Sequence, residues 1–469
     1  MITTLAQFRS FNRPAQLLMI NQLTINIGFY MLMPYLAGYL SQDLGLAAWT
    51  VGLVLGMRNL SQQGLFLVGG SLADRVGYKP MILAGLALRV LGFALLAFAT
   101  SLPTLLLASA LTGMAGALFN PAVRAYLSHE AGHRKVEAFA TFNVFYQAGI
   151  LLGPLLGIAV LGFSFRMVCL VAAVLFAALL LAQALALPAR RGPTATPALG
   201  AGGDPAAGRS MLGDWRVVVG NRPFLLFSLA MIGSYVLNFQ VYLGLPLEVR
   251  RATGGTGGVT ALFVLSGILT VCGQVRLTMW VKKRWTPAQA LQRGLTLMSL
   301  AFVPLALSTA LPTAAGAGDR SWWTYAAAIA PVLASTSILT VATMVVYPFE
   351  MATIVELSGG TMVATYYGLY NTLAGVGIAV GNLLTGAALD AGRSHGLPAL
   401  PWIALTGTGL LCAGAITALH RTNHLTPPDP TPHPTADPTT GPTTGPTTRP
   451  APSASMSTGA VTVPSTTPR

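Results

Sequence analysis

Residues 69–83, GGSLADRVGYKPMIL, are polar and charged, yet they lie between two long apolar stretches of the chain. Asp74, Arg75 and Lys79 occur within a few residues of Gly70 and Gly77, and glycine permits a sharp reversal of the backbone. Short charged segments between apolar stretches are typical of connections at a membrane surface. We therefore predict that residues 70–80 join two membrane-spanning helices.

The composition supports a membrane protein. Of the 469 residues, 53% are hydrophobic and only 9% are charged, whereas soluble domains carry about 25% charged residues. Apolar stretches long enough to cross a bilayer recur from residue 15 to residue 420. The sequence predicts an all-α membrane protein with twelve spans, at residues 15–40, 47–70, 80–101, 103–126, 138–162, 166–187, 223–246, 258–281, 287–310, 323–348, 362–388 and 400–420.

The net charge of +14 would suggest a nucleic-acid partner in a soluble protein. Here the basic residues lie between the apolar stretches, so orientation in the membrane explains them better than nucleic-acid binding. With the N-terminus in the cytoplasm, about 15 lysines and arginines fall on the cytoplasmic side and about 5 on the other. This predicts a multi-pass protein of the bacterial plasma membrane with both termini in the cytoplasm.

The chain divides into five predicted parts. Residues 1–14 form a cytoplasmic segment, and residues 15–187 form the first six-helix bundle. Residues 188–222, rich in Pro, Gly and Ala, are expected to form a flexible cytoplasmic linker before the second bundle at residues 223–420. Residues 421–469 are rich in Pro and Thr and are expected to be a disordered cytoplasmic tail.

The two halves repeat one another in parallel. Matching residues recur at equal spacing in corresponding spans: Tyr30 and Pro34 match Tyr242 and Pro246, and Asn143, Gly149 and Gly153 match Asn371, Gly377 and Gly381. Two like-oriented halves place a substrate site between them near the middle of the membrane.

The stretch G-S-L-A-D-R-V-G-Y-K-P at residues 70–80 resembles the loop signature of the major facilitator superfamily, G-x-L-A-D-R-x-G-R-K, with Tyr78 as the departure. The resemblance implies a gating loop whose charges pair with helix ends and hold one face of a transporter closed. Asp74 is expected at a helix N-terminus, whose positive end favours an anion. The alternative is a structural loop that only sets the angle between two spans. The gating residues are Gly70, Asp74, Arg75, Gly77 and Lys79.

The fifth span contains Y-Q-A-G-I-L-L-G-P-L-L-G at residues 146–157, which resembles the G-x-x-x-G-P-x-x-G signature of drug:proton antiporters. Gly149, Gly153 and Gly157 form a flat stripe against which another helix can pack closely, and Pro154 favours a bend. Such a stripe also occurs in helices that only pack. The N-terminal half as a whole resembles bacterial multidrug-resistance facilitators, which implies an exporter.

Proton coupling requires a group that titrates during the transport cycle. Many such antiporters carry an arginine in R-x-x-Q-G of the fourth span, but Ser109 stands at that position, so the arginine's role does not transfer. The acidic candidates are Asp74, Glu137 and Glu350. None of the three is well placed for a relay in the middle of the membrane. Glu350, which follows Pro348, has the best claim, but the sequence favours a solvated helix end for it.

Arg58 and Arg89 lie near the centres of the second and third spans, where an ionisable group is costly and indicates a functional site. Alternatively, both bind backbone carbonyls and stabilise packing. Aromatic faces with a few hydrogen-bonding groups suit amphipathic organic substrates, although they also occur in ordinary helix contacts. The predicted cavity residues are Asn26, Tyr30, Arg58, Gln62, Arg89, Asn143, Gln147, Tyr235, Asn238, Tyr242 and Tyr370.

Catalytic and nucleotide-binding motifs are absent from the sequence, and the three cysteines lack the spacing of a metal site. We expect no enzyme activity, no metal and no cofactor. The predicted function is export of small amphipathic compounds by alternating access, in exchange for protons, by a monomer in the lipid bilayer. The alternatives are an inward-working facilitator for a metabolite or organic anion, and a membrane receptor or scaffold that does not transport.

Overall fold

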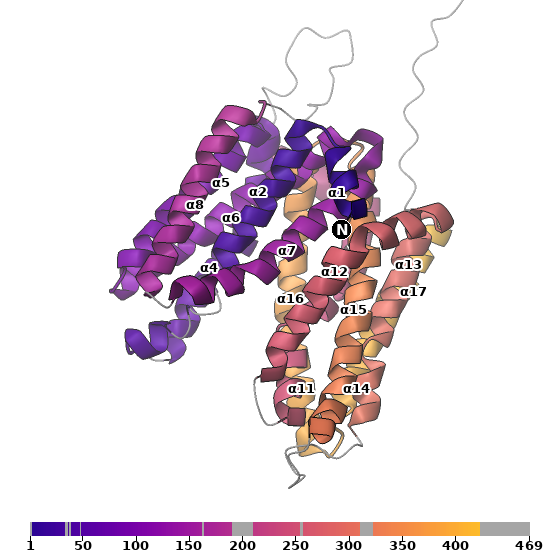
Figure 1. Ribbon diagram of the computed structural model, residues 1–469. Coiled ribbons are helices and arrows are strands. Elements are labelled where there is room, and N and C mark those ends of the chain that lie inside the picture. The colour runs from indigo at the N-terminus through magenta and orange to yellow at the C-terminus, as the bar shows by residue number, and fades with distance from the viewer. Residues whose placement is uncertain are drawn as a thin grey trace, which may run out of the picture. The chain divides into compact units, whose positions relative to one another are not determined.

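The computed structural model describes residues 2–32, 36, 39–46, 48–161, 164–189, 210–253, 257–309 and 322–422. Regular structure within these residues is entirely helical (Figure 1). The predicted C-terminal tail from residue 423 onward and residues 190–209 of the predicted linker lie outside the described residues.

Among its described residues, the first half contains six long helices and three short ones. They are α1 (Ile2–Arg9), α2 (Arg13–Tyr30), the π-helix η1 (Tyr39–Asp43), α4 (Ala48–Val76), α5 (Tyr78–Phe98), α6 (Leu102–Ala131), the 3-10 helix η2 (Gly132–Arg134), α7 (Lys135–Leu161) and α8 (Phe165–Ala186).

The second half repeats this order after a short helix, α9. Its helices are α9 (Met211–Gly220), α10 (Arg222–Phe239), α11 (Gly244–Thr253), α12 (Gly257–Arg284), α13 (Pro287–Leu300), α14 (Val303–Ser308), α15 (Trp322–Leu357), α16 (Val363–Ser394) and α17 (Leu400–Arg421).

Hydropathy confirms the predicted fold class. Nine helical stretches among the described residues are long and apolar enough to cross a membrane, and the 56-residue stretch Leu102–Gly157 contains two predicted spans. The more polar helices α2 and α4 occupy the first and second predicted spans, which brings the set to the twelve expected. The twelve spans are arranged as two bundles, one from each half of the chain.

Glycines allow the same helix pair to pack closely in both halves. A Cβ atom added at Gly149 or Gly153 of α7 would lie 2.6 or 2.7 Å from a side-chain atom of α2. A Cβ atom added at Gly377 or Gly381 of α16 would lie 2.3 or 2.5 Å from a side chain of α10. The helix α7 continues as one helix through Pro154. The repeat detected in the sequence therefore corresponds to equivalent packing of α7 on α2 and of α16 on α10.

The predicted loop at residues 70–80 is almost entirely helical. The helix α4 continues to Val76 and α5 begins at Tyr78, so Gly77 alone connects them. Gly77 has φ +110°, a conformation that glycine adopts without steric penalty, which explains how the chain reverses within one residue. We call the end of the helices at which this residue lies the Gly77 end.

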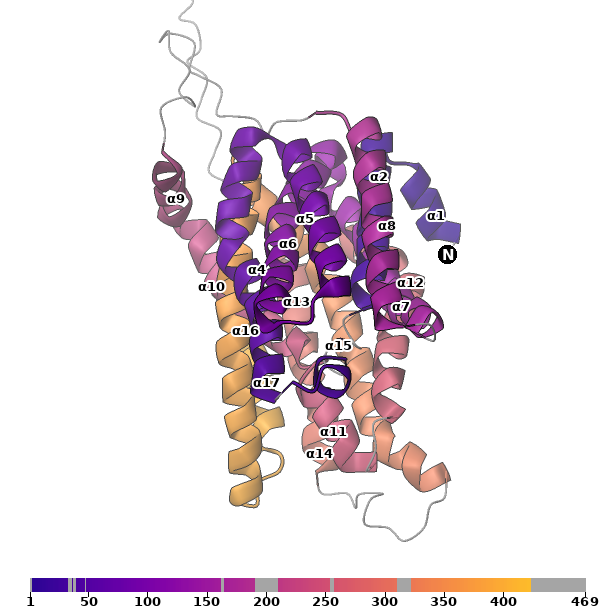
Figure 2. The ribbon, with the colours of Figure 1, turned by 90° about the vertical axis from the view of Figure 1, so that its left-hand side faces the viewer.

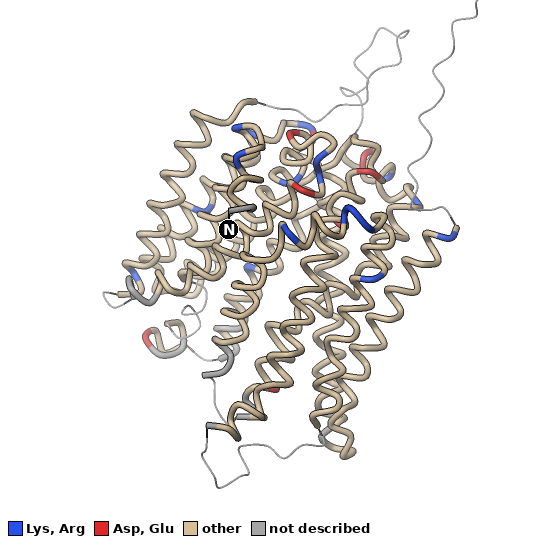
Figure 3. The backbone as a smooth tube through the Cα atoms, turned by 45° about the vertical axis from the view of Figure 1, so that its right-hand side comes forward, with Lys and Arg blue, Asp and Glu red and all other residues tan. Residues whose placement is uncertain are grey.

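The most extensive contacts between the bundles are made by two pairs of helices. The helix α4 runs beside α16, and α7 lies against α12 (Figure 2). A Cβ atom at Gly70 of α4 would lie 2.1 Å from the carbonyl oxygen of Ala364, and one at Gly368 of α16 would lie 2.5 Å from that of Phe66. The backbones of α4 and α16 are therefore in direct contact. Most of the charged residues lie toward the Gly77 end of the helices (Figure 3).

Two short helices were not predicted. Residues 2–9 form α1 within the N-terminal segment, and residues 211–220 form α9 within the segment expected to be a flexible linker. Both make polar contacts with the Gly77 end of the bundles, as described below.

Candidate functional site

Asp74 connects the two bundles at the Gly77 end. Its carboxylate accepts hydrogen bonds from the backbone N–H groups of Ala364, at 3.1 Å, and Thr365, at 2.7 Å, and from the Thr365 hydroxyl at 2.7 Å. Ala364 and Thr365 are the second and third residues of α16, where backbone donors have no partner within the helix. The carboxylate from the first bundle thus caps a helix of the second.

The remaining charged residues of the signature bind nearby segments. Arg75 forms an ion pair with Asp214 of α9, with its Nε 2.8 Å from the carboxylate. Lys79 donates to the carbonyl oxygen of Ala184 at 2.7 Å, near the C-terminus of α8. Tyr78, the departure from the signature, is buried and its hydroxyl is hydrogen-bonded with Asp74. The tyrosine therefore contributes a neutral donor where the signature has a basic residue.

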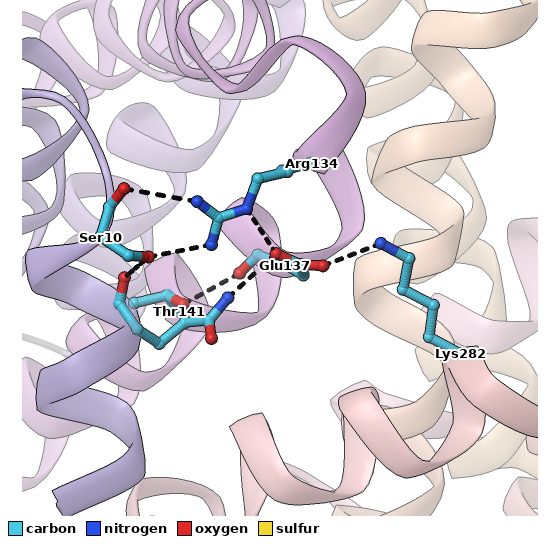
Figure 4. A network of polar contacts seen from close by, with 6 residues as sticks. Ser10, Arg134, Glu137, Thr141 and Lys282 are labelled. Atoms are coloured by element: carbon cyan, nitrogen blue, oxygen red, sulfur yellow. Dashed lines mark hydrogen bonds and ion pairs between the residues drawn. The ribbon is translucent and has the colours of Figure 1, made fainter. Parts of the chain in front are cut away.

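Glu137 of α7 is a second connection between the bundles (Figure 4). It accepts hydrogen bonds from Arg134 at 2.7 Å and Gln7 of α1 at 3.1 Å, and from Lys282 of α12 at 2.8 Å. Arg134 also donates to the Ser10 hydroxyl at 2.9 Å. Because two cations neutralise the Glu137 carboxylate, the geometry favours a permanent ion-pair cluster over the predicted alternative of a titrating proton carrier.

Glu350 lies inside the protein, near the Gly77 end of α15. Its side chain is 4% exposed, so the alternative of a solvated helix end is wrong. Its carboxylate accepts hydrogen bonds from Tyr370 of α16 and Tyr235 of α10. The Tyr235 and Tyr370 rings pack edge to face at 5.7 Å between centroids. The two phenols hold a buried carboxyl group in an aromatic setting.

Arg124 of α6 reaches this group from the other bundle, and it was not predicted as a site residue. Its guanidinium donates to the side-chain oxygen of Asn371 at 3.0 Å, is hydrogen-bonded with Tyr347, and lies within electrostatic range of Glu350. Arg124 is near the predicted end of the fourth span, so the sequence alone did not separate it from the basic residues of the loops. The available signal was its position three residues after Pro121, a proline inside α6, as Glu350 lies two residues after Pro348 inside α15.

Asn143 makes another polar contact between the bundles. It donates to Gln274 of α12 at 2.9 Å, and Gln274 in turn donates to Thr278 at 3.0 Å and to the carbonyl oxygen of Met344 at 2.8 Å. Asn26, by contrast, lies within the first bundle, where it donates to the carbonyl oxygen of Tyr146 at 2.8 Å. Both asparagines are buried.

A pocket lies between α7, α10 and α12. Its lining includes the predicted residues Gln147, Asn238 and Tyr242, together with Ile150, Leu151, Val241, Phe263, Ser266 and Gly267. Tyr242 is hydrogen-bonded with Tyr30, its counterpart in the sequence repeat. The small cavity thus combines aliphatic and aromatic side chains with the hydrogen-bonding groups of Gln147, Asn238 and Ser266.

The two predicted cavity arginines differ in placement. Arg58 is half-buried, with its guanidinium 4.7 Å from the centroid of Phe29 and within electrostatic range of Tyr30. Arg89 is 7% exposed, lies over Phe119 of the same bundle, and has one guanidinium nitrogen without a hydrogen-bond partner among the described residues. Gln62 packs against Gly116 between α4 and α6. Arg58 is thus close to Tyr30, the partner of the pocket residue Tyr242.

Two bundles of spanning helices with a polar interface and a small pocket between them are the arrangement of a multi-pass membrane transporter. The family model of the Major Facilitator Superfamily matches residues 18–382. The chain belongs to this superfamily, whose members transport small molecules and are not enzymes.

Relatives and one solved structure agree with this assignment. The chain is 49% identical over 423 residues, 90% of this chain and 96% of the relative, to an uncharacterized transporter of the same type from Mycobacterium tuberculosis (strain ATCC 25618 / H37Rv). It is 32% identical over 396 residues, 84% of this chain and 91% of the relative, to the multidrug resistance protein MdtH of Edwardsiella ictaluri (strain 93-146). The fold matches the human organic anion transporter MFSD10 (TETRAN) with a TM-score of 0.64 at 17% identity, over 86% of this chain and 99% of that one.

Proposed function

We propose that the protein exports small amphipathic compounds by alternating access, in exchange for protons. The observation that carries this proposal is the buried carboxyl group of Glu350, held by Tyr235 and Tyr370 beside the interface between the bundles. A carboxyl group in such a place can bind and release a proton at modest cost when its surroundings change between conformations.

The pocket and the relatives support the substrate class. Tyr242 and Phe263 offer aromatic contacts to a substrate at this interface, and Gln147 and Asn238 offer hydrogen bonds. The relatives named multidrug resistance protein MdtH are similar over most of their length. Arg58, which has no ion-pair partner among the described residues, favours neutral or anionic substrates over cations.

The same proposal includes the setting of the transporter. The excess of basic residues in the loops at the Gly77 end favours a cytoplasmic location for that end. Both termini would then be cytoplasmic in a bacterial plasma membrane. We also expect a monomer, because each chain carries both bundles and the pocket lies between them.

The test is transport by purified protein in liposomes under an imposed pH gradient, with a panel of fluorescent dyes and antibiotics. We expect Glu350→Gln to abolish gradient-driven export of every substrate, because the amide keeps the size of the side chain but cannot exchange a proton. Exchange of labelled for unlabelled substrate, which needs no proton movement, should continue at a rate within about threefold of the wild-type rate.

Glu356→Gln is the matched control, because Glu356 lies six residues further along the same helix and is exposed. It should transport like the wild type. Gradient-driven export that persists in Glu350→Gln would contradict the proposed proton site. Uptake of the panel in place of export would support the inward-working alternative, and the absence of any flux would support a receptor or scaffold.

A further inference from the structure

The two bundles carry opposite charges that face each other at one place in the interior. Glu350 belongs to the second bundle and Arg124 to the first, and the two lie within electrostatic range. Other bonds between the bundles, at Asp74 and Glu137, lie closer to the ends of the helices. Arg124 donates to Asn371, and the residue before Asn371, Tyr370, donates to Glu350, so this is the connection between bundles beside the proposed proton site.

Arg124 is held in this position by neutral groups. Its guanidinium donates to Asn371 of α16 at 3.0 Å, and Asn371 donates to the carbonyl oxygen of Tyr367 at 2.6 Å. Tyr347 of α15 is also hydrogen-bonded with Arg124. These partners belong to the second bundle, so the side chain of Arg124 extends across the interface. Asn371 is the repeat counterpart of Asn143, which also bonds the opposite bundle but as the donor, to Gln274.

The ionisable groups around Glu350 can be assigned by element. Arg124 faces it from α6, Tyr235 from α10, Tyr347 from its own helix, and Tyr367 and Tyr370 from α16. Tyrosine is uncharged near neutral pH. Arg124 is therefore the group in this set whose charge can compensate an ionised Glu350.

We propose that Arg124 is the positioning residue through which the ionisation state of Glu350 controls closure of the two bundles at the Gly77 end. With Glu350 ionised, attraction to Arg124 across the interface stabilises the closed arrangement that the structure shows. A proton on Glu350 removes this attraction, and the bundles separate more easily. This inference rests on the proposed role of Glu350 but not on the identity of the substrate.

The sign of the effect follows from burial. An unpaired carboxylate in a closed, dry interface is strongly unfavourable, whereas a carboxylate next to a guanidinium is stabilised. In the wild type, raising the pH should therefore increase the closed fraction. Without the arginine charge, ionised Glu350 would oppose closure, so the pH dependence should vanish or reverse in sign.

The experiment measures the conformational equilibrium without substrate or gradient. Spin labels at Ser101 and His395, exposed residues at the opposite end of each bundle, report by pulsed electron resonance how far that end opens. The labels are placed in full-length protein whose three native cysteines are replaced by alanine. In this background, the ratio of molecules closed at the Gly77 end to molecules open at that end should rise on the order of tenfold between pH 5.5 and pH 8.5.

Arg124→Gln should remove or reverse this pH dependence, and Arg124→Lys should preserve its sign because the charge remains. Arg166→Gln, which changes an exposed arginine at the opposite end, should show the same pH dependence as the unmodified background. In the Glu350→Gln background, Arg124→Gln should cause no further change in pH dependence. A normal pH profile in Arg124→Gln would overturn the proposal.

Asn371→Ala provides a test that leaves both charges in place. It should lower the closed fraction at every pH while keeping the pH dependence. Loss of the pH dependence in Asn371→Ala would assign the coupling to the hydrogen bond and would overturn the proposal. Failure of the proposed export function is scored separately, by flux through Glu350→Gln, so the two results are distinguishable.

Discussion

At the scale of single residues, Asp74 shows how one carboxylate can join two bundles. It accepts three hydrogen bonds at the start of α16 and a fourth from Tyr78. Hydrogen bonds to a charged group contribute about 1.5–3 kcal/mol each to stability, and a negative charge near a helix N-terminus contributes about 0.3–1 kcal/mol. Asp74 is therefore expected to contribute strongly to closure of the Gly77 end.

Asp74→Asn tests this contribution. The amide keeps the size of the side chain and one acceptor oxygen but loses the charge, so we expect the closed arrangement to weaken by about 2 kcal/mol. Flux in liposomes should fall at least tenfold while the protein remains folded and inserted, as judged by detergent size-exclusion profiles. Asp43→Asn, at an exposed aspartate of η1, is the control. Unchanged flux in Asp74→Asn would show that the contact between Asp74 and α16 is only structural.

The sequence predicted some of these residues and missed others for a physical reason. Asp74 and the glycines of α7 belong to short motifs that can be recognised from a few consecutive residues. The placement of Arg124 depends on its hydrogen bond to Asn371, which lies 247 positions away in the sequence. Glu350 was identified as an acid near a helix end, but its burial depends on tyrosines brought in by α10 and α16. Local patterns cannot indicate such partners.

At the scale of elements, the close helix pairs were predictable and the short helices were not. A stripe of glycines on α7 implies a close neighbour because no Cβ atoms stand in the way, and the structure places α2 there. The helices α1 and α9 are 8 and 10 residues long. Isolated helices of this length are unstable in water, so tertiary contacts decide their existence.

The contacts of α1 suggest that this helix stabilises the Glu137 cluster. Gln7 donates to Glu137, which also accepts from Lys282 of the second bundle. The hydroxyl of Ser10, directly after α1, accepts from Arg134. Replacing both polar groups, as Gln7→Ala with Ser10→Ala, should weaken closure by about 1–2 kcal/mol.

Spin-label distances should then show an increased open fraction at the Gly77 end, with flux changed by less than about tenfold. Thr100→Ala, at an exposed threonine of the opposite end that carries no label, should leave the distances unchanged. Distances in the double variant that equal those of the wild type would show that α1 is not part of the connection.

At the scale of the whole helical unit, the fold follows from the bilayer. Backbone polar groups cannot remain unpaired in hydrocarbon, so long apolar stretches become spanning helices, and their number and loop charges could be predicted from the sequence. The repeat of residues between the halves predicted equivalent packing, and α7 on α2 matches α16 on α10. The sequence could not predict which side chains meet between the bundles, because the two halves carry different polar residues at that interface.

The central claim is that the bundles must separate at the Gly77 end during every transport cycle. Glu137 and Lys282 are in contact across this end, with 2.8 Å between the carboxylate oxygen and Nζ. In a protein carrying Glu137→Cys and Lys282→Cys on a background without native cysteines, a short bismaleimide joins α7 to α12. The account predicts that crosslinking abolishes flux in liposomes, while each single-cysteine variant treated with the same reagent keeps its flux. Flux that continues undiminished in the fully crosslinked protein would contradict it.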